Sequence, residues 1–258
     1  MDLHLGGRLA LVTGGSKGIG LACARGLLAE GARVVIASRS SAHIAAALAE
    51  LPGAQGISAD FVDAEAAARA IEKVEDEGGP IDILVNSAGA AKRVAVDDLS
   101  PAAWRAAFDA KFFSYINAID PLVKRMAARG RGVIINIIGS GGKVASPTHL
   151  AGGSANAALM LATAGLGNAY ASRGVRVVGV NPTLTDTSRV QEGLEARARQ
   201  EGISLQDARQ RSVEAIPLGR MARPEEIADA VAFLASDRAS YITAVTLGMD
   251  GAQYPTVL

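Results

Sequence analysis

The stretch Arg8-Leu9-Ala10-Leu11-Val12-Thr13-Gly14-Gly15-Ser16-Lys17-Gly18-Ile19-Gly20 decides the fold of this chain. An apolar run is followed at once by a glycine-rich turn and then by a segment of helical period. Glycines let the backbone approach a diphosphate closely, and the amides and dipole of a helix N-terminus favour negative charge there. A glycine cluster alone can serve steric needs, but the order strand, turn, helix indicates a dinucleotide-binding turn.

The same alternation of short apolar runs and longer alanine-rich stretches continues along the chain. The runs are continuously apolar, which is typical of strands in a sheet covered on both faces. We predict strands at Arg8–Thr13, Arg33–Ser38, Gln55–Asp60, Ile81–Asn86, Gly132–Ile138, Val175–Asn181 and Ala244–Asp250. We predict helices near Gly18–Glu30, Ser41–Leu51, Ala64–Glu77, Pro101–Arg129, Gly153–Arg173 and Pro224–Ala235. Strands joined by crossover helices pair in parallel. The sequence therefore predicts a single α/β domain over residues 1–258, with a parallel sheet covered on both faces.

One segment, Asp186–Val213, departs from this pattern because it is polar, rich in both charges and only weakly helical. It is either a solvated excursion or a mobile lid over a substrate site. Its place directly after the sixth predicted strand favours the lid.

The charge balance limits the partners of the protein. Lysine and arginine total 26 residues, and aspartate and glutamate also total 26. Such a weak overall field argues against nucleic acid or an anionic membrane, and it leaves a small-molecule substrate as the expected partner. The first residues lack the apolar core of a signal peptide, and no apolar run reaches bilayer-spanning length. The single cysteine, Cys23, rules out an intramolecular disulfide, so we expect a cytoplasmic protein. We predict no metal site.

The end of the second predicted strand distinguishes between two nucleotide cofactors. An acidic side chain there would bind the ribose hydroxyls of NAD, whereas Ser38 and Arg39 offer a hydroxyl and a guanidinium that suit a 2′-phosphate. Lys17 in the glycine turn supplies a second cation on the same side. The alternative is that both cations are ordinary surface residues. We expect NADP(H) to be preferred over NAD(H).

Two further strand ends add to this site. The Asp60 carboxylate suits the adenine amino group, although it could equally cap the following helix. The small residues of Asn86-Ser87-Ala88-Gly89 leave room for the cofactor ribose, although Asn86 could instead satisfy groups between strands. Because the carboxyl ends of parallel strands meet at one edge of the sheet, these residues are best interpreted as one crevice.

These motifs together resemble those of the short-chain dehydrogenase/reductase family, over essentially the whole chain. Thr13–Gly20 is similar to the family's TGxxxGxG turn, and Asn86–Gly89 to its NNAG motif with Ser87 in the second place. Further similarities lie in Val180–Thr187, Ile216–Arg220, Pro224–Ala228, Tyr241–Thr243 and Asp250-Gly251. The resemblance implies a doubly wound, Rossmann-type parallel sheet of seven strands, NAD(P) binding and a homo-oligomer, a tetramer or a dimer. The cofactor residues expected are Gly14, Ser16, Lys17, Gly18, Ile19, Gly20, Ser38, Arg39, Asp60, Phe61, Asn86, Ala88, Gly89, Asn156, Pro182, Thr183, Leu184 and Thr187.

The resemblance breaks at the residues that the family uses for chemistry, namely a serine, a tyrosine, a lysine and an asparagine. Counting from Asn136, the serine position falls on Gly139 and the tyrosine position, thirteen further on, on Gly152. The lysine position is Asn156, and the asparagine position on the preceding helix is Lys111. Hydride transfer to a carbonyl leaves an alkoxide that an acid must protonate, which the family's tyrosine does with its pKa lowered by the lysine. Glycine has no proton to offer.

Four residues are candidates to restore this chemistry. Lysine and asparagine have exchanged places, so Lys111 keeps a positive charge in the site and Asn156 keeps an amide for the nicotinamide ribose. His149 lies three residues before Gly152 and, if the helix begins early enough, shares its face; the imidazole then enters the space of the missing ring. Ser140, one past the serine position, could supply a hydroxyl. The alternatives are an exposed loop histidine and a serine or lysine without a catalytic role.

Three functions therefore stay open at the level of the sequence. The first is an NADP(H)-dependent oxidoreductase acting on a carbonyl or alcohol with a rearranged proton donor. The second is a non-redox enzyme on the same scaffold, such as a lyase, isomerase or hydrolase. The third is an inactive nucleotide-binding protein that associates with a partner. The intact nucleotide motifs favour the first by analogy of fold.

Overall fold

The computed structural model describes residues 2–89 and 91–255. Within this part of the chain, the apolar runs form one parallel sheet in the order β3-β2-β1-β4-β5-β6-β7. The strands are β1 (Leu9–Thr13), β2 (Arg33–Ser38), β3 (Gln55–Ser58), β4 (Ile83–Asn86), β5 (Gly132–Ile137), β6 (Val175–Pro182) and β7 (Thr246–Met249). The predicted doubly wound, seven-stranded sheet is confirmed. Its strand order reverses between β1 and β4, which is where ligands bind in such sheets.

Two strand boundaries differ from the prediction in ways that affect the site. β3 ends at Ser58, so Asp60 lies in the following turn, where its Oδ1 accepts a hydrogen bond from the Val62 amide. The cap of the next helix is instead Asp63, whose carboxylate accepts from two amides of the first turn. β6 runs one residue further than predicted because Pro182 still pairs with Met249 of β7.

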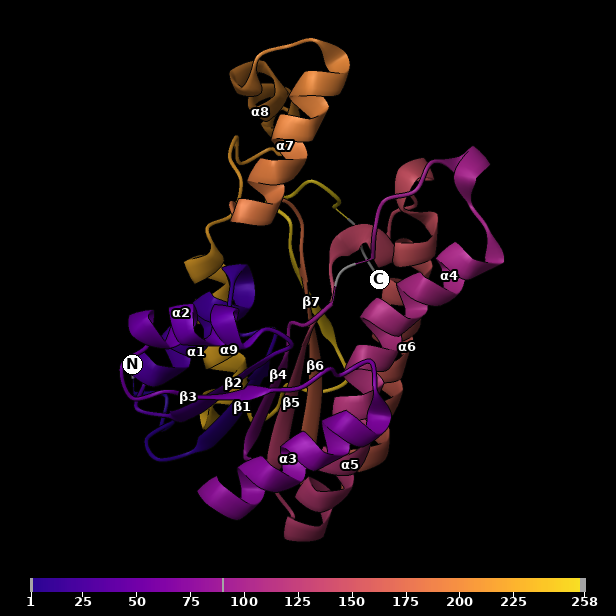
Figure 1. Ribbon diagram of the computed structural model, residues 1–258. Helices are drawn as coiled ribbons and strands as arrows, with labels where there is room; N and C mark the ends of the chain where they lie inside the picture. The colour runs from indigo at the N-terminus through magenta and orange to yellow at the C-terminus, as the bar shows by residue number, and fades with distance from the viewer. Residues whose placement is uncertain (1, 90, 256–258) are drawn as a thin grey trace.

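Helices connect the strands and cover both faces of the sheet (Figure 1). One face carries α1 (Gly18–Ala29), α2 (Ser41–Glu50) and α9 (Pro224–Ala235). The other carries α3 (Ala64–Gly78), α5 (Ser114–Arg129) and α6 (Leu150–Ala171). α4 (Pro101–Phe108) precedes α5 and packs beside α6.

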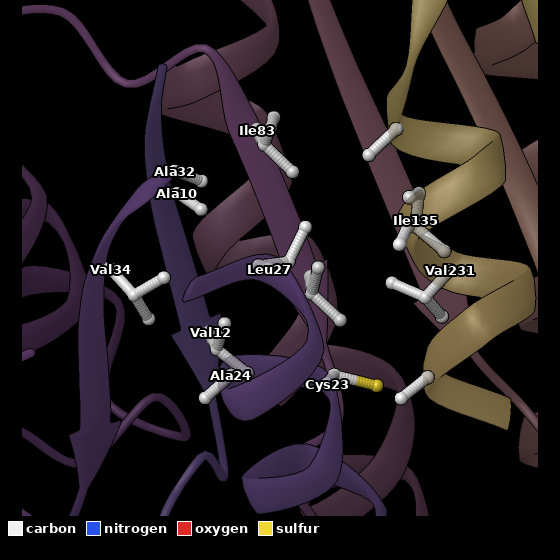
Figure 2. Packing of buried hydrophobic residues seen from close by; sticks show 14 of the residues in the cluster. Ala10, Val12, Cys23, Ala24, Leu27, Ala32, Val34, Ile83, Ile135 and Val231 are labelled. Atoms are coloured by element: carbon white, nitrogen blue, oxygen red, sulfur yellow. The ribbon is translucent and has the colours of Figure 1, made fainter. Parts of the chain in front are cut away.

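The core follows directly from the alternation of side chains along each strand. In β1, Ala10 and Val12 belong to the core under α1 and α9, whereas Leu9 and Leu11 belong to the core under α3 and α5. Both sets are buried, which explains why the strands are apolar without interruption. Figure 2 shows Cys23 of α1 in the first core; its thiol is fully buried, as expected for a core residue.

The predicted helix over Pro101–Arg129 is not regular. Between α4 and α5 the backbone forms a π-helical turn, Asp109–Phe113, which contains Lys111. There the Ser114 hydroxyl donates to the Ala110 carbonyl at 2.9 Å. The same carbonyl lies so close to Gly89 that a Cβ at Gly89 would overlap it. π-helical turns occur often at functional sites, and this one faces the end of β4.

The predicted helix over Gly153–Arg173 begins three residues earlier, at Leu150. A 3₁₀ turn, Pro147–His149, leads into α6 without a break. Gly153 within the helix has a steric reason, because a Cβ there would lie 2.7 Å from the Gly141 carbonyl oxygen. Because α6 begins directly after His149, Gly152 lies in the first turn of the helix.

The polar segment Asp186–Val213 is more ordered than its sequence indicates. It forms two helices, α7 (Ser188–Glu201) and α8 (Leu205–Val213), which stand above the carboxyl edge of the sheet (Figure 1). They share a small core of Leu194, Ala198, Ala208 and Met221. Among the described residues, no helix combines the length and apolar character that crossing a bilayer requires.

Candidate active site

The glycine turn after β1 leaves the N-terminus of α1 open. Gly14 and Gly18 have positive φ angles of 66° and 53°. A Cβ at Gly14 would lie 2.7 Å from the Ala88 backbone, and one at Gly20 would overlap the Gly14 carbonyl. Lys17 begins α1 without a side-chain cap, and the first turn has no acidic residue. The first amides of α1 are therefore available to an anion, which the helix dipole favours.

Beside this turn lies a pocket of about 230 Å³ at the ends of β1, β2 and β4. The predicted cofactor residues that line it are Gly14, Ser38, Arg39, Asp60, Phe61, Ala88 and Gly89. The guanidinium of Arg39 is exposed, and its Nη1 lies 4.0 Å from Oδ2 of Asp60. Lys17 Nζ lies 3.1 Å from Nε2 of His43, a residue of α2 that the sequence analysis did not select. Two cations and an imidazole thus gather beside the end of β2.

Asn86 is held by other side chains rather than left open to a ligand. Its Oδ1 accepts from the Thr13 hydroxyl at 3.2 Å, and its Nδ2 donates to Asn136 Oδ1 at 3.0 Å. Asn136 in turn donates to the Thr163 hydroxyl at 2.9 Å. This buried chain of hydrogen bonds joins β1, β4, β5 and α6 and fixes the relative positions of their ends, which is a structural role the sequence analysis left open.

A second cavity, a cleft of about 490 Å³, lies over the ends of β5 and β6. It brings together all the residues predicted to restore catalysis, although they come from three separate parts of the chain. They are Lys111, Ser140, His149 and Asn156, and the glycines at the vacated serine and tyrosine positions, Gly139 and Gly152, line the cleft beside them. The predicted cofactor residues Gly89, Pro182, Thr183 and Leu184 line the same cleft. Thr187 lies just beyond it, where its hydroxyl caps α7 by accepting from the Val190 amide.

The His149 imidazole occupies the space beside Gly152. A Cβ at Gly152 would overlap Cε1 of the ring and lie 2.8 Å from its Nδ1, so residue 152 has room for no side chain while His149 is present. Nδ1 is buried, and within the described residues it has no hydrogen-bond partner. Burial lowers the pKa of His149, and the charges of Arg93, Arg189 and Lys111 lower it further.

Lys111 is buried at the floor of the same cleft, with 8% of its surface exposed. Its Nζ donates to the Ile137 carbonyl at 2.9 Å and to the Tyr115 hydroxyl at 3.0 Å. The pKa of Lys111 is lowered from 10.5 to about 7. Burial is the larger cause, and the positive charge of Arg189 is the smaller one. An ammonium of this kind can lose its proton near neutral pH.

Asn156 and Ser140 complete the cleft. Asn156 is 5% exposed, and its Oδ1 is buried with no partner among the described residues. Gly139 and Gly141 lie close to its Nδ2: a Cβ built at either glycine would be 3.5 Å from that atom. Ser140 begins a short 3₁₀ turn and is half-buried. An amide oxygen left without a donor in such a place is suited to accept from a bound hydroxyl.

Comparison with known proteins places this architecture among named oxidoreductases. Residues 14–252 match the family described as enoyl-(acyl carrier protein) reductase. L-xylulose reductase of Bos taurus is 33% identical over 252 residues, which cover 97% of this chain and 98% of the relative. Cis-4-hydroxycyclohexanecarboxylate dehydrogenase of Sinomonas cyclohexanicum is 35% identical over 95% of each chain. The crystal structure of L-sorbose reductase from Gluconobacter frateurii, complexed with NADPH and L-sorbose, superposes with a TM-score of 0.94 at 28% identity over the whole of both chains.

The chain belongs to the short-chain dehydrogenase/reductase family. The fold and the glycine turn are those expected of this family of oxidoreductases. The register from Asn136 predicts that this member has Gly139, Gly152 and Asn156 in place of the family's serine, tyrosine and lysine, and the count of seven from Trp104 predicts Lys111 in place of its asparagine.

Two functional candidates in this dehydrogenase/reductase were missed at the level of the sequence. Arg93 and Arg189 line the cleft and act on the pKa of His149. Arg93 follows β4 in a loop without regular structure, and Arg189 lies in the first turn of α7. No spacing rule joins a loop residue and a helix residue so far apart in the chain. The only signal available was the position of both residues after a strand whose end lines the crevice.

Proposed function

We propose that this protein is an NADP(H)-dependent oxidoreductase that interconverts a carbonyl and an alcohol, with His149 as the proton donor in the direction of reduction. One observation carries the proposal: the imidazole occupies the space beside Gly152, in the cleft where Lys111 and Asn156 also lie. NADPH, when bound, supplies the hydride. The remaining chemistry, which is to bind, to orient and to protonate, falls to the residues of the chain.

The residues present fit a nicotinamide nucleotide. The uncapped N-terminus of α1 suits the diphosphate, and the small pocket between Arg39 and Phe61 suits the adenosine. The buried, unpartnered Oδ1 of Asn156 suits a ribose hydroxyl. Arg39 and Lys17 suit a 2′-phosphate, and similar proteins whose structures were solved with NADPH support the phosphorylated cofactor.

His149 is placed to hold and deliver one proton. Because Nδ1 is enclosed, we assign the transferable proton to Nε2. The pKa of His149 lies below its ordinary value of 6.5, so the protonated form declines as pH rises through that lower value. Reduction is therefore expected to slow with rising pH and oxidation to speed up, while Lys111 keeps the cleft positive up to a pH of about 7.

The test combines nucleotide binding with turnover. Fluorescence titration of the purified protein with NADPH and NADH should show tighter binding of NADPH. A carbonyl panel with product analysis, rather than absorbance alone, should then identify a reduced product. H149Q should lose about 10²–10⁴-fold in kcat, the usual contribution of a general acid, and should lose the pH dependence. Absence of saturable binding for either nucleotide rejects the proposal.

We further propose that α7 and α8, residues 186–213, act as a lid over the cleft. Leu184, Arg189 and Val190 lie at the base of this segment and also line the cleft, so a shift of the helices would change access to it. We also propose a homo-oligomer in the cytoplasm. Leu161 on α6 is 76% exposed and Phe113 beside α5 is 44% exposed, which favours burial of these helices against a second copy. Light scattering after size-exclusion chromatography tests this.

A further inference from the structure

The walls of the cleft carry charge of one sign. Arg93, Lys111, His149 and Arg189 line it, and no aspartate or glutamate is among the described residues that do so. The chain as a whole has equal numbers of acidic and basic residues. The positive charge is thus local to the cleft, and it lies where a substrate must bind beside Asn156.

Arg93 is tied to the turn that carries His149. Its Nη1 donates to the Thr148 hydroxyl at 3.2 Å, and the Val94 amide donates to the Thr148 carbonyl at 3.2 Å. These contacts hold the guanidinium at the rim of the cleft next to the imidazole. They also leave the other nitrogens of this five-donor group free for a ligand.

Arg189 lines the same cleft from the first turn of α7. The dipole of a helix disfavours a cation at this end, so the position costs stability rather than adding it. Arg93 and Arg189 are both exposed as whole residues, and within residues 2–89 and 91–255 neither forms an ion pair with a carboxylate. Burial of the guanidinium is the largest cause that lowers the pKa of Arg189; the charge of Arg93 lowers it next, and Glu192 opposes the shift with a smaller influence. The two like charges therefore act on each other and are offset only in part.

We infer that the substrate carries a carboxylate or phosphate group that binds between Arg93 and Arg189, with its carbonyl turned toward His149. The inference rests on the proposed function. Guanidinium groups bind planar and tetrahedral oxyanions through paired N–H donors, and such charge-assisted hydrogen bonds are the strong ones. An anion in this place offsets the repulsion between the two guanidinium groups and draws α7 toward the loop of Arg93.

Binding is tested without turnover. The probes are cyclohexanecarboxylate, phenyl phosphate and the neutral cyclohexanecarboxamide, titrated calorimetrically into the protein with and without NADP⁺ in a phosphate-free buffer. Saturable binding is expected for at least one anion and at least 10-fold weaker binding for the amide. R93Q and R189Q should each weaken the anion about 10- to 100-fold, the value of one charge-assisted hydrogen bond. R199Q, on the outer end of α7, is the matched control and should bind as the wild type does. Equal binding of amide and anion overturns the inference.

Turnover separates the inference from the proposed function. The probes are 4-oxocyclohexanecarboxylate and its methyl ester with NADPH. A preference for the acid of at least 10-fold in kcat/KM, lost in R93Q and R189Q, supports the inference. Equal turnover of acid and ester overturns the inference but still supports the proposed oxidoreductase activity. Loss of NADPH affinity in R93Q or R189Q also overturns it, because the arginines would then hold the cofactor's own diphosphate. Failure of the wild type to bind NADPH rejects the proposed function instead, and the titration without nucleotide still decides whether the cleft binds anions.

Discussion

Replacing Lys111 by methionine should stabilise the protein, and by an amount that depends on pH. Methionine has nearly the shape of lysine without its charge, and it fills the same channel under the cleft. The substitution removes the hydrogen bonds from Nζ to Ile137 and Tyr115. The Ile137 carbonyl keeps a donor, because the Tyr115 hydroxyl also bonds to it at 2.6 Å. The charge, rather than the packing, is therefore what the variant changes.

The magnitude follows from the pKa of Lys111, which burial lowers from 10.5 to about 7. Between these two values the unfolded chain binds more protons than the folded one, so the stability of the wild type rises with pH. At 1.36 kcal/mol for each pKa unit, burying the charged amine costs roughly 5 kcal/mol below pH 7, and the cost fades as pH approaches 10.5. Between pH 6 and pH 9 the linkage relation integrates to about 2.5 kcal/mol.

The assay is urea unfolding of the wild type and K111M at pH 6, 7.5 and 9, at one protein concentration. The stability advantage of K111M should be largest at pH 6 and should shrink by about 2.5 kcal/mol by pH 9. Groups other than Lys111 titrate in both proteins and cancel in the difference. Parallel stability curves across this range would refute the reasoning, because they would mean that the buried amine keeps an ordinary pKa.

Three further substitutions test the geometry of the site. Gly152→Ala should destabilise the wild type more than it destabilises H149A, with a coupling of about 1–3 kcal/mol by thermal unfolding, because the new Cβ meets Ala91 in both backgrounds but meets the imidazole only in the wild type; additivity would contradict this. Arg39→Ala should weaken NADPH about 10- to 100-fold in a fluorescence titration and leave NADH unchanged, and an equal loss for both would remove the 2′-phosphate assignment. Gly89→Ala should cost about 3 kcal/mol or more, because φ is +81° and the Cβ overlaps a carbonyl, whereas Gly79→Ala, at +82° in open space, should cost only the backbone strain.

The fold was predictable because the information that specifies it is local. Each strand is a short apolar run. The side chains of β1 enter two separate cores in strict alternation, and burial on both faces therefore requires an uninterrupted apolar sequence, which can be recognised without the structure. The proximity of His149 to Gly152 was predictable for the same reason, since three residues along one helical turn fix the geometry. The condition for this proximity was an early start of the helix, and α6 does begin at Leu150, directly after His149.

The parts that sequence missed depend on contacts between distant segments. Nothing in Asp109-Ala110-Lys111-Phe112-Phe113 marks a π-helical turn, because it contains neither glycine nor proline. The turn becomes intelligible only when the loop of Gly89 is seen packed on the Ala110 carbonyl. The convergence of Arg93 and Arg189 is similar, because the position of α7 over the sheet edge, rather than any motif, brings them to one cleft.

The proposed anion site would couple the charge of the substrate to the supply of the proton. Burial comes first among the causes that lower the pKa of His149, and the charges of Arg93, Arg189 and Lys111 follow. A neutral substrate would add to the burial and leave the cations uncompensated, so the imidazole would hold its proton less well when the substrate is bound. An oxyanion between the two arginines offsets their charge, and the pKa of His149 rises toward its ordinary value at the moment when a proton is needed. Under this proposal the anionic group by which the arginines select the substrate also raises the pKa of His149, so that a larger share of the imidazole is protonated when the substrate is bound.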